Sequence, residues 1–246
     1  MSELFSIQLQ NRQQQGRDGV WLDLPTTTEQ VQAALRQIGI SSDNPQGLFI
    51  SGYFAEEEKR FAIPYNMVLA SNVDELNFLA ARLETLSNAE RTELNAALQT
   101  PQSELSSIGK ITDFPENVDY YVHLPDVHGP AQLGDYYLNR SGMVDMPEEW
   151  KGGIDTAQFG RYVAQQEQGA FTEYGYLVKS GDVWQKVHEG QPVPEEYRVL
   201  SFPAPEVLRD SANIPPPVQA ETKPQKVLPI ILNGKDSAER MLSLIH

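Results

Sequence analysis

The residue types best suited to metal binding gather in the stretch HLPDVH, where His123 and His128 flank Asp126. Two imidazoles five residues apart, with a proline between them, do not share a helical face as they do in the i,i+4 arrangement of HExxH. A third ligand is not obvious in the sequence, and zinc sites use at least three protein ligands. The pattern therefore favours a partly exposed structural role for both histidines, and we expect no metal and no cofactor.

Adjacent carboxylates are the second group of residues that could take part in catalysis, as in the runs at 56–58, 148–149 and 195–196. General acid–base catalysis needs two carboxylates held apart in a cleft, in environments that separate their pKa values. Neighbouring acids on a turn are more typical of a solvated face. The sequence also has no GxSxG elbow, no GxGxxG loop and no Walker loop. We therefore predict that the protein is not an enzyme, and keep a hydrolase with an unrecognised carboxylate pair as an alternative.

The net charge points to a basic partner. The 246 residues have a formal net charge of −15, and residues 201–246 contribute nothing to it because their acids and bases cancel. An acidic surface repels nucleic acid and attracts basic proteins, including those built to hold nucleic acid. Basic residues are sparse and unclustered, so direct nucleic-acid binding is not expected. Acidity that serves only solubility remains the open alternative.

The composition also indicates a compartment. The chain has no cysteine, which suits a reducing cytosol. No basic, apolar segment with a small-residue cleavage site opens the sequence, so we do not expect secretion, and the longest apolar run is far too short to span a membrane. We expect a cytoplasmic protein with no membrane association.

Periodicity and helix caps predict the elements that position these residues. In residues 1–70, strands at 5–9, 20–24 and 48–54 accompany a helix that begins with a Thr26–Glu29 capping box and stops at Gly39. In residues 71–128, Asn72 caps one helix and a Ser87–Glu90 capping box opens a second, followed by a short strand near residues 120–124.

In residues 129–202, helices are expected at 133–138 and 159–166, and a strand at 171–178. Residues 203–246 are predicted to form a Pro-rich linker and a short terminal helix. The predicted fold class is α+β, with three small α/β or helical domains in an elongated, acidic chain that ends in a Pro-rich C-terminal tail. Tyrosines crowd residues 120–176, where core packing is favoured over a protein-binding surface.

Four short motifs in the third unit carry a family resemblance. They are LG-Y at residues 133–136, P-E at 147–148 before ID at 154–155, FGR at 159–161 and FT--GY at 171–176. Upstream, WLDLP at 21–25 and DELNFLA at 74–80 occur in the matching order. In this order and spacing the chain resembles the ArdA-type antirestriction proteins over roughly residues 1–180.

The resemblance implies a homodimer shaped as a curved, acidic rod that mimics bent duplex DNA. Such a rod occupies the DNA-binding groove of type I restriction-modification enzymes, on their specificity and modification subunits. The genes of this family travel on conjugative and other mobile genetic elements. The alternative is a non-inhibitory acidic interaction module of a mobile element with the same fold.

The spacing of carboxylates fits mimicry, because i,i+4 neighbours on a helix lie roughly 5–6 Å apart and i,i+2 neighbours on a strand about 6.6 Å apart. Duplex DNA carries one charge per roughly 1.7 Å of axis. Arg140, Lys151 and Arg161 interrupt the acidic pattern of the third unit, and the chain extends past the resemblance. The candidate partner-binding residues are Asp113, Glu116, Asp119, Asp126, Asp135, Asp145, Glu148, Glu149, Asp155, Glu167 and Glu173.

Overall fold

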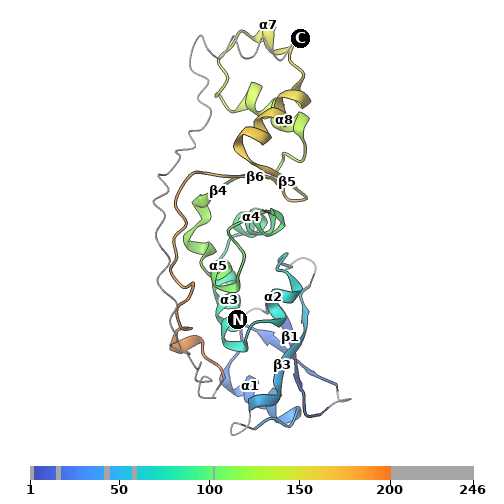
Figure 1. Ribbon diagram of the computed structural model, residues 1–246, viewed down its shortest axis with the longest axis vertical. Helices are drawn as coiled ribbons and strands as arrows, with labels where there is room; N and C mark the ends of the chain where they lie inside the picture. Colours follow the sequence, from blue (N-terminus) through green and yellow to red (C-terminus); the bar gives the residue numbers. More distant parts are fainter. Residues whose placement is uncertain (1–2, 15–17, 42–44, 57–59, 102, 201–246) are drawn as a thin grey trace, which may run out of the picture.

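The computed structural model describes residues 3–14, 18–41, 45–56, 60–101 and 103–200. They form an elongated molecule in which a sheet with one helix lies at one end, a group of helices in the middle and a second helical group at the other end (Figure 1). Helices and two small antiparallel sheets occur in the same chain, which confirms the α+β class. Within these ranges no helix combines the length and apolar character needed to cross a membrane.

The first unit is a three-stranded antiparallel sheet with strand order β2-β1-β3. Its elements are β1 (Phe5–Asn11), β2 (Val20–Leu24), α1 (Thr28–Gln37), a 3-10 turn (Pro45–Gly47), β3 (Leu48–Phe54) and α2 (Tyr65–Leu69). Phe5, Ile7 and Leu9 alternate with more exposed residues, so one face of β1 is buried in the core. All three strands expected from the sequence are confirmed.

The start of α1 differs from the prediction by one residue. Thr27 caps the helix and forms the capping box with Gln30, so the predicted Thr26–Glu29 box is wrong. Thr26 is instead buried and donates its backbone N–H to Asn77 Oδ1 at 2.7 Å. A contact from a helix 51 residues away therefore decides where α1 begins. Gly39 ends the helix region with a φ of 68°, as expected.

The middle unit is helical, and the caps predicted for its first two helices are confirmed. Its elements are α3 (Val73–Glu84), α4 (Asn88–Gln99), α5 (Ile108–Thr112) and two 3-10 turns (Phe114–Glu116 and Val118–Tyr120). Asn72 accepts from the Glu75 backbone N–H, and Ser87 with Glu90 completes the second capping box. Leu76, Leu79 and Leu83 are fully buried along one face of α3, which follows from their helical spacing.

The far unit contains a second small sheet and three helices. Its elements are β4 (Tyr121–Leu124), α6 (Pro130–Asp135), a π-helical turn (Tyr136–Arg140), α7 (Glu148–Lys151), α8 (Thr156–Glu167), β5 (Ala170–Thr172) and β6 (Gly175–Lys179). The sheet order is β4-β6-β5. The single strand predicted at 171–178 is wrong, because the chain turns at Glu173 and Tyr174 and pairs with itself.

Two glycines bring α6 and α8 into close contact. A Cβ on Gly160 would lie 1.8 Å from the Pro130 carbonyl oxygen, and one on Gly134 would lie 1.9 Å from the Thr156 carbonyl oxygen. Both glycines belong to the short motifs noted above, LG-Y and FGR. Their role in this fold is to let two helix backbones touch.

Buried side chains form two clusters along the molecule. The larger one extends from Leu4 and the first sheet through α3 and α4 to Leu177 and Val199. The smaller one lies among α6, α8 and β6 and includes Leu133, Phe159 and Tyr176. The expected boundary near residue 70 falls within the larger cluster, and the three-domain division stays a prediction.

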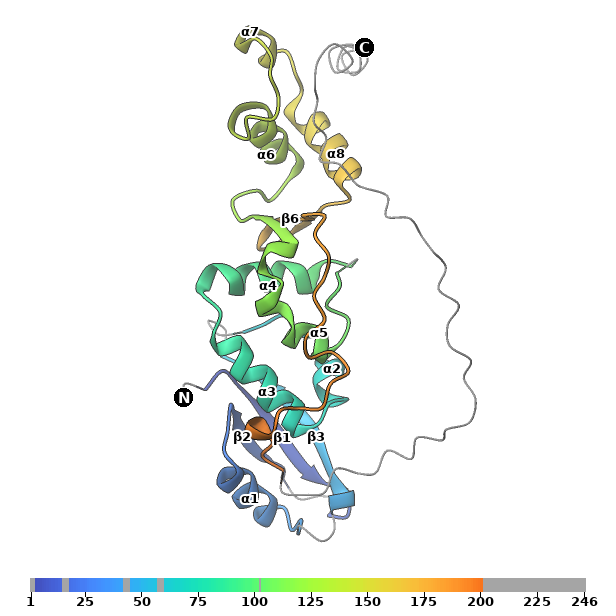
Figure 2. The same cartoon turned by 90° about the vertical axis from the view of Figure 1, so that its left-hand side faces the viewer.

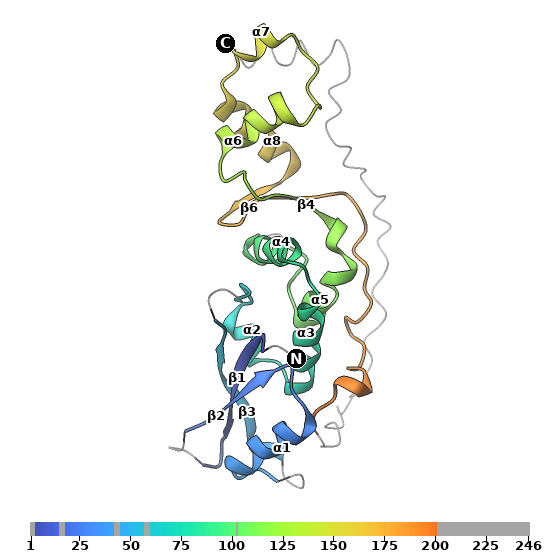
Figure 3. The ribbon, with the colours of Figure 1, turned by 180° about the vertical axis from the view of Figure 1, so that it is seen from behind.

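After β6, residues 180–200 run back along the middle unit towards α3; we call them the return segment (Figure 2). They contain one 3-10 turn, Glu195–Tyr197. The sequence patterns did not indicate this course. It places the last described residues beside the starts of α1 and α3 (Figures 2 and 3).

Candidate functional site

Asp113 is the clearest departure from the predicted acidic surface. It is completely buried, and its two carboxylate oxygens accept the backbone N–H groups of His188 and Glu189 at 2.6 and 3.2 Å. A buried charge is tolerated only where such partners satisfy it. Asp113 therefore anchors the return segment and does not contribute to a display surface.

Three of the predicted acids are paired with bases. Glu116 pairs with Arg82, Asp135 with Arg140 at 3.3 Å, and Glu148 with Lys151 at 2.6 Å. The exposed pairs contribute little stability, but each base cancels part of the local negative field. These three carboxylates are weaker candidates for attracting a basic partner than the sequence indicated.

Glu167 is also partly buried. It ends α8 half-buried, and its carboxylate accepts the hydroxyls of Tyr137 and Tyr176 at 2.5 and 3.1 Å. Burial raises the pKa of Glu167, and the two hydroxyl hydrogen bonds oppose that rise. The group therefore joins α8 to the π-helical turn and to β6, in the smaller core cluster.

Two exposed acids have a structural partner as well. Asp155 caps α8 by accepting the Gln158 backbone N–H at 3.0 Å. Glu173, at the tip of the β5–β6 hairpin, accepts from the side chain of Gln99 on α4. Both carboxylates keep an exposed position in spite of these bonds.

What remains is a set of exposed acids with no basic partner among the described residues. We call it the acidic set; its members are Asp119, Asp126, Asp145, Glu149, Asp155 and Glu173. They lie on the 3-10 turn Val118–Tyr120, on other turns and loops, in the first turn of α7, at the N-cap of α8 and at the β5–β6 hairpin tip; these elements extend from the middle of the molecule to its α7 end (Figure 1). The structure thus retains six of the eleven predicted residues as unpaired surface charge.

A further acidic group was missed by sequence reasoning. Glu93 on α4 lies near Glu90 on the same helix and near Asp119 on the 3-10 turn Val118–Tyr120. Burial, then repulsion from Glu90 and from Asp119, raises the pKa of Glu93 to about 8. Glu90 and Glu93 share an i,i+3 face, which was readable from the sequence, but only packing brings Asp119 to them.

The tyrosines follow the favoured prediction of core packing. Tyr120, Tyr121 and Tyr176 are buried, and Tyr162 is the most exposed of the group. Tyr120 packs edge-on against Tyr121 and Trp184, the latter from the return segment. The aromatic residues of this region therefore hold elements together.

His123 and His128 were predicted to have a partly exposed structural role. His123 Nε2 is 2.7 Å from the Tyr174 carbonyl oxygen, and His128 lies exposed beyond it. A different trio, Asp113, Glu116 and His188, offers three ligand atoms within 4.8 Å of one another. Asp113 and Glu116 already have the donor partners described above, so a cation there would compete with amide and guanidinium groups.

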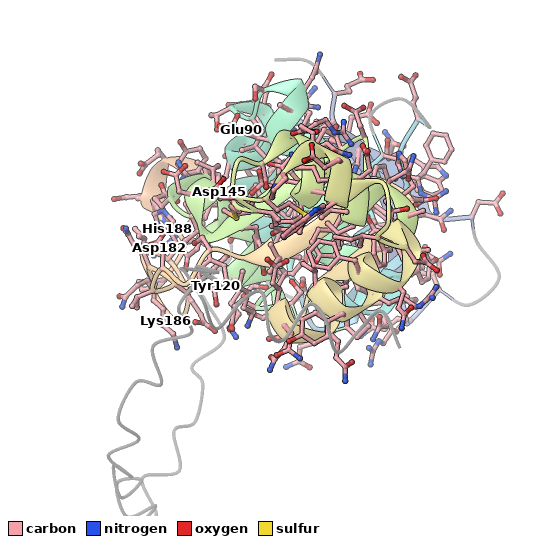
Figure 4. All side chains as sticks on the ribbon, turned by 90° about the horizontal axis from the view of Figure 1, so that it is seen from above. Glu90, Tyr120, Asp145, Asp182, Lys186 and His188 are labelled. Carbon is pink, nitrogen blue, oxygen red and sulfur yellow. The ribbon has the colours of Figure 1, made fainter. Side chains whose placement is uncertain are left out.

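Seen along the long axis, the return segment occupies one side of the molecule. Asp182, Lys186 and His188 lie together there, whereas Glu90 projects on a different side (Figure 4). Lys186 pairs with Glu189 at 3.3 Å within this segment. The return segment therefore presents mixed charge, unlike the acidic set.

Fold and sequence together define an elongated α+β protein with a net negative charge and several exposed carboxylates. The family model described as "Antirestriction protein (ArdA)" matches residues 15–178. The chain therefore belongs to the ArdA family of antirestriction proteins, as the motif order predicted. The family is one of inhibitor proteins, and membership implies an antirestriction function through interaction with restriction-modification enzymes. No curated protein matches the chain.

Proposed function

We propose that this protein inhibits type I restriction-modification enzymes by presenting the acidic set to the groove that binds DNA. The observation that carries the proposal is the presence of six exposed carboxylates that have no basic partner among the described residues, on turns, loops and helix starts between the 3-10 turn Val118–Tyr120 and the β5–β6 hairpin. Grooves that hold DNA are lined with Lys and Arg, which neutralise phosphates. Carboxylates held in fixed positions on a folded protein can pair with the same Lys and Arg side chains in place of phosphates.

The placement of these acids supports recognition by shape as well as charge. Asp155 is fixed as a helix cap and Glu173 by its bond to Gln99, so their positions are set before binding. Preorganised charge loses less entropy on binding than charge on mobile side chains. A mimic of this kind needs neither a nucleophile nor a metal.

Family membership suggests that two copies act together. A homodimer of this elongated chain would double the length of the acidic surface, and the protein is proposed to act in the cytoplasm on DNA that arrives with a mobile element. The partner surfaces are proposed to be the specificity and modification subunits, which hold the DNA.

The test is a titration of the protein into a type I enzyme, following the cleavage of unmodified duplex DNA. The variant to compare carries Asp119→Asn, Asp126→Asn, Asp145→Asn and Glu149→Gln. Exposed ion pairs contribute about 0.2–1 kcal/mol each, so removing four should weaken inhibition by about fourfold to several hundredfold.

The matched control removes the same number of negative charges from other parts of the surface. It carries Asp18→Asn, Asp182→Asn, Glu195→Gln and Glu196→Gln, all at exposed positions outside the acidic set. Equal losses in both variants would show that only net charge matters, and a total loss from one substitution would contradict a distributed array. A folded protein that leaves cleavage unaffected would favour the alternative, a non-inhibitory module with this fold.

A further inference from the structure

The far edge of β2 borders a groove. β1 pairs with one edge of β2, and within the described residues no strand pairs with the other. A cavity of about 470 Å³ lies beside this free edge. Its lining combines β2 with one stripe of α1, namely Val20, Trp21, Leu22, Asp23, Thr27, Gln30, Ala33, Ala34 and Gln37, together with Glu3, Pro25 and Thr26.

The lining has the two features that a strand-addition site requires. The strand edge offers backbone groups with which no described strand pairs, and the helix stripe offers small side chains at Ala33 and Ala34 that leave room for larger ones. Leu22 is buried beneath the groove and Trp21 is half exposed at its rim. An added strand would therefore place alternate apolar side chains against α1.

The described chain ends next to this groove. Asn77 donates to the Tyr197 carbonyl oxygen at 3.0 Å and accepts the backbone N–H of Thr26 at 2.7 Å. One side chain therefore joins the return segment to a residue that lines the groove. Beyond it, the Val199 and Leu200 backbone N–H groups donate to Asp74 at the start of α3. Residues 201–246 follow from that point.

Those residues include a segment that fits the groove in composition. The sequence VLPIIL at 227–232 is apolar throughout, with Lys226 before it and Lys235 shortly after it. Glu3 and Asp23 supply exposed negative charge at the groove. Pro229 is compatible with an edge strand when its nitrogen points away from the sheet, because Leu228 and Ile230 then face β2 with their backbone groups.

We propose that residues 227–232 of the same chain dock in this groove as a fourth strand beside β2. The 26 residues between Leu200 and Val227 are long enough, since covalent geometry lets a chain of that length reach up to roughly 85 Å. Tethering also raises the effective concentration of the segment to about the millimolar range. The proposal is independent of antirestriction activity, because the groove lies in the first unit and away from the acidic set.

The test uses the absence of cysteine from the natural sequence. The full chain carrying Ala33→Cys and Ile230→Cys is treated with oxidised glutathione, and the rate of disulfide formation is followed by gel mobility. The control chain carries Ala89→Cys with Ile230→Cys, which puts the partner thiol at an exposed position on α4. Docking predicts a cross-link within one chain that forms at least tenfold faster than in the control.

Two further measurements distinguish docking of the segment from random collisions between the two thiols. Adding Leu228→Asp and Leu232→Asp to the Ala33→Cys, Ile230→Cys chain should reduce the rate to that of the control. An excess of a peptide spanning residues 224–236 should slow cross-linking in the same way. Equal rates in the test and control chains would overturn the proposal. Cross-links found only between two chains would also overturn it, and would assign the β2 edge to a second copy.

Discussion

At the scale of single residues, burial decides what each carboxylate does. Asp113 and Asp126 are both acids that the sequence placed on one surface, yet Asp113 is buried against two backbone amides and Asp126 lies in an exposed turn. A buried carboxylate gains its stability from fixed donors, and an exposed one contributes to the long-range field. Charge counting along the sequence cannot separate the two roles.

The first prediction concerns the titration of Glu93. Its raised pKa, about 8, means that the folded protein holds this proton more tightly than the unfolded chain does. The stability that results is present below pH 4.5 and is lost as pH rises from there towards 8. Glu93→Gln removes that loss, so its melting temperature should fall less than that of the natural protein between pH 5 and pH 8.

Thermal melts at several pH values measure this effect. Glu149→Gln is the control, because Glu149 is exposed and should leave the pH profile parallel to that of the natural protein. A Glu93→Gln profile that is also parallel would show that Glu93 titrates near its ordinary value when folded.

At the scale of elements, the second prediction concerns the crossing of α6 and α8. Gly160→Ala would force a Cβ to within 1.8 Å of the Pro130 carbonyl oxygen, so the two helices must separate. Overpacking of this kind costs about 1–3 kcal/mol or more, which lowers the melting temperature by roughly 2–12 °C. Gly152→Ala is the control because a Cβ there meets nothing within 4 Å. Equal melting temperatures for the two variants would contradict the close crossing.

The third prediction concerns the anchor of the return segment. Asp113→Ala removes the acceptor of two buried amides and should destabilise the protein by about 2–4 kcal/mol. Hydrogen exchange at His188 and Glu189 should become more than tenfold faster. Asp126→Ala, at an exposed turn, should change neither exchange rate. Unchanged protection at His188 in the Asp113→Ala protein would show that other contacts hold the segment.

Local signals explain what the sequence could predict about these elements. Asn72 and Ser87 were correctly assigned as caps because a cap and its partner lie three residues apart. The course of the return segment was missed because it depends on contacts with distant residues, whereas the β5–β6 turn was missed although local hydrogen bonds of Thr172 with Tyr174 and Gly175 close it. Glu173 meets Gln99 across 74 positions, and Asp113 meets His188 across 75. Because its partner is so distant in sequence, the burial of Asp113 could not be predicted, and Asp113 was wrongly included among the candidate surface residues.

At the scale of the whole molecule, charge is distributed unevenly along an elongated shape. The acidic set extends from the middle to the α7 end, and mixed charge occupies the return segment. The bases Arg140 and Lys151 neutralise Asp135 and Glu148 within the far unit. An enzyme groove lined with Lys and Arg would therefore be attracted to particular stretches of the surface.

The last prediction follows from that distribution. If inhibition depends on an array of exposed charges, raising salt must weaken it, because the screening length falls from about 10 Å at 0.1 M to about 3 Å at 1 M. A plot of log inhibition constant against log salt should be steep for the natural protein. It should be shallower for the variant lacking four members of the acidic set, since fewer charge contacts remain to be screened. The control with four changes outside that set should keep the natural slope, and the slope is measured from cleavage titrations at several salt concentrations. A steep slope in all three proteins would show that the charged contacts lie outside the acidic set. A flat slope in all three would show that binding depends on apolar contacts and not on charge mimicry.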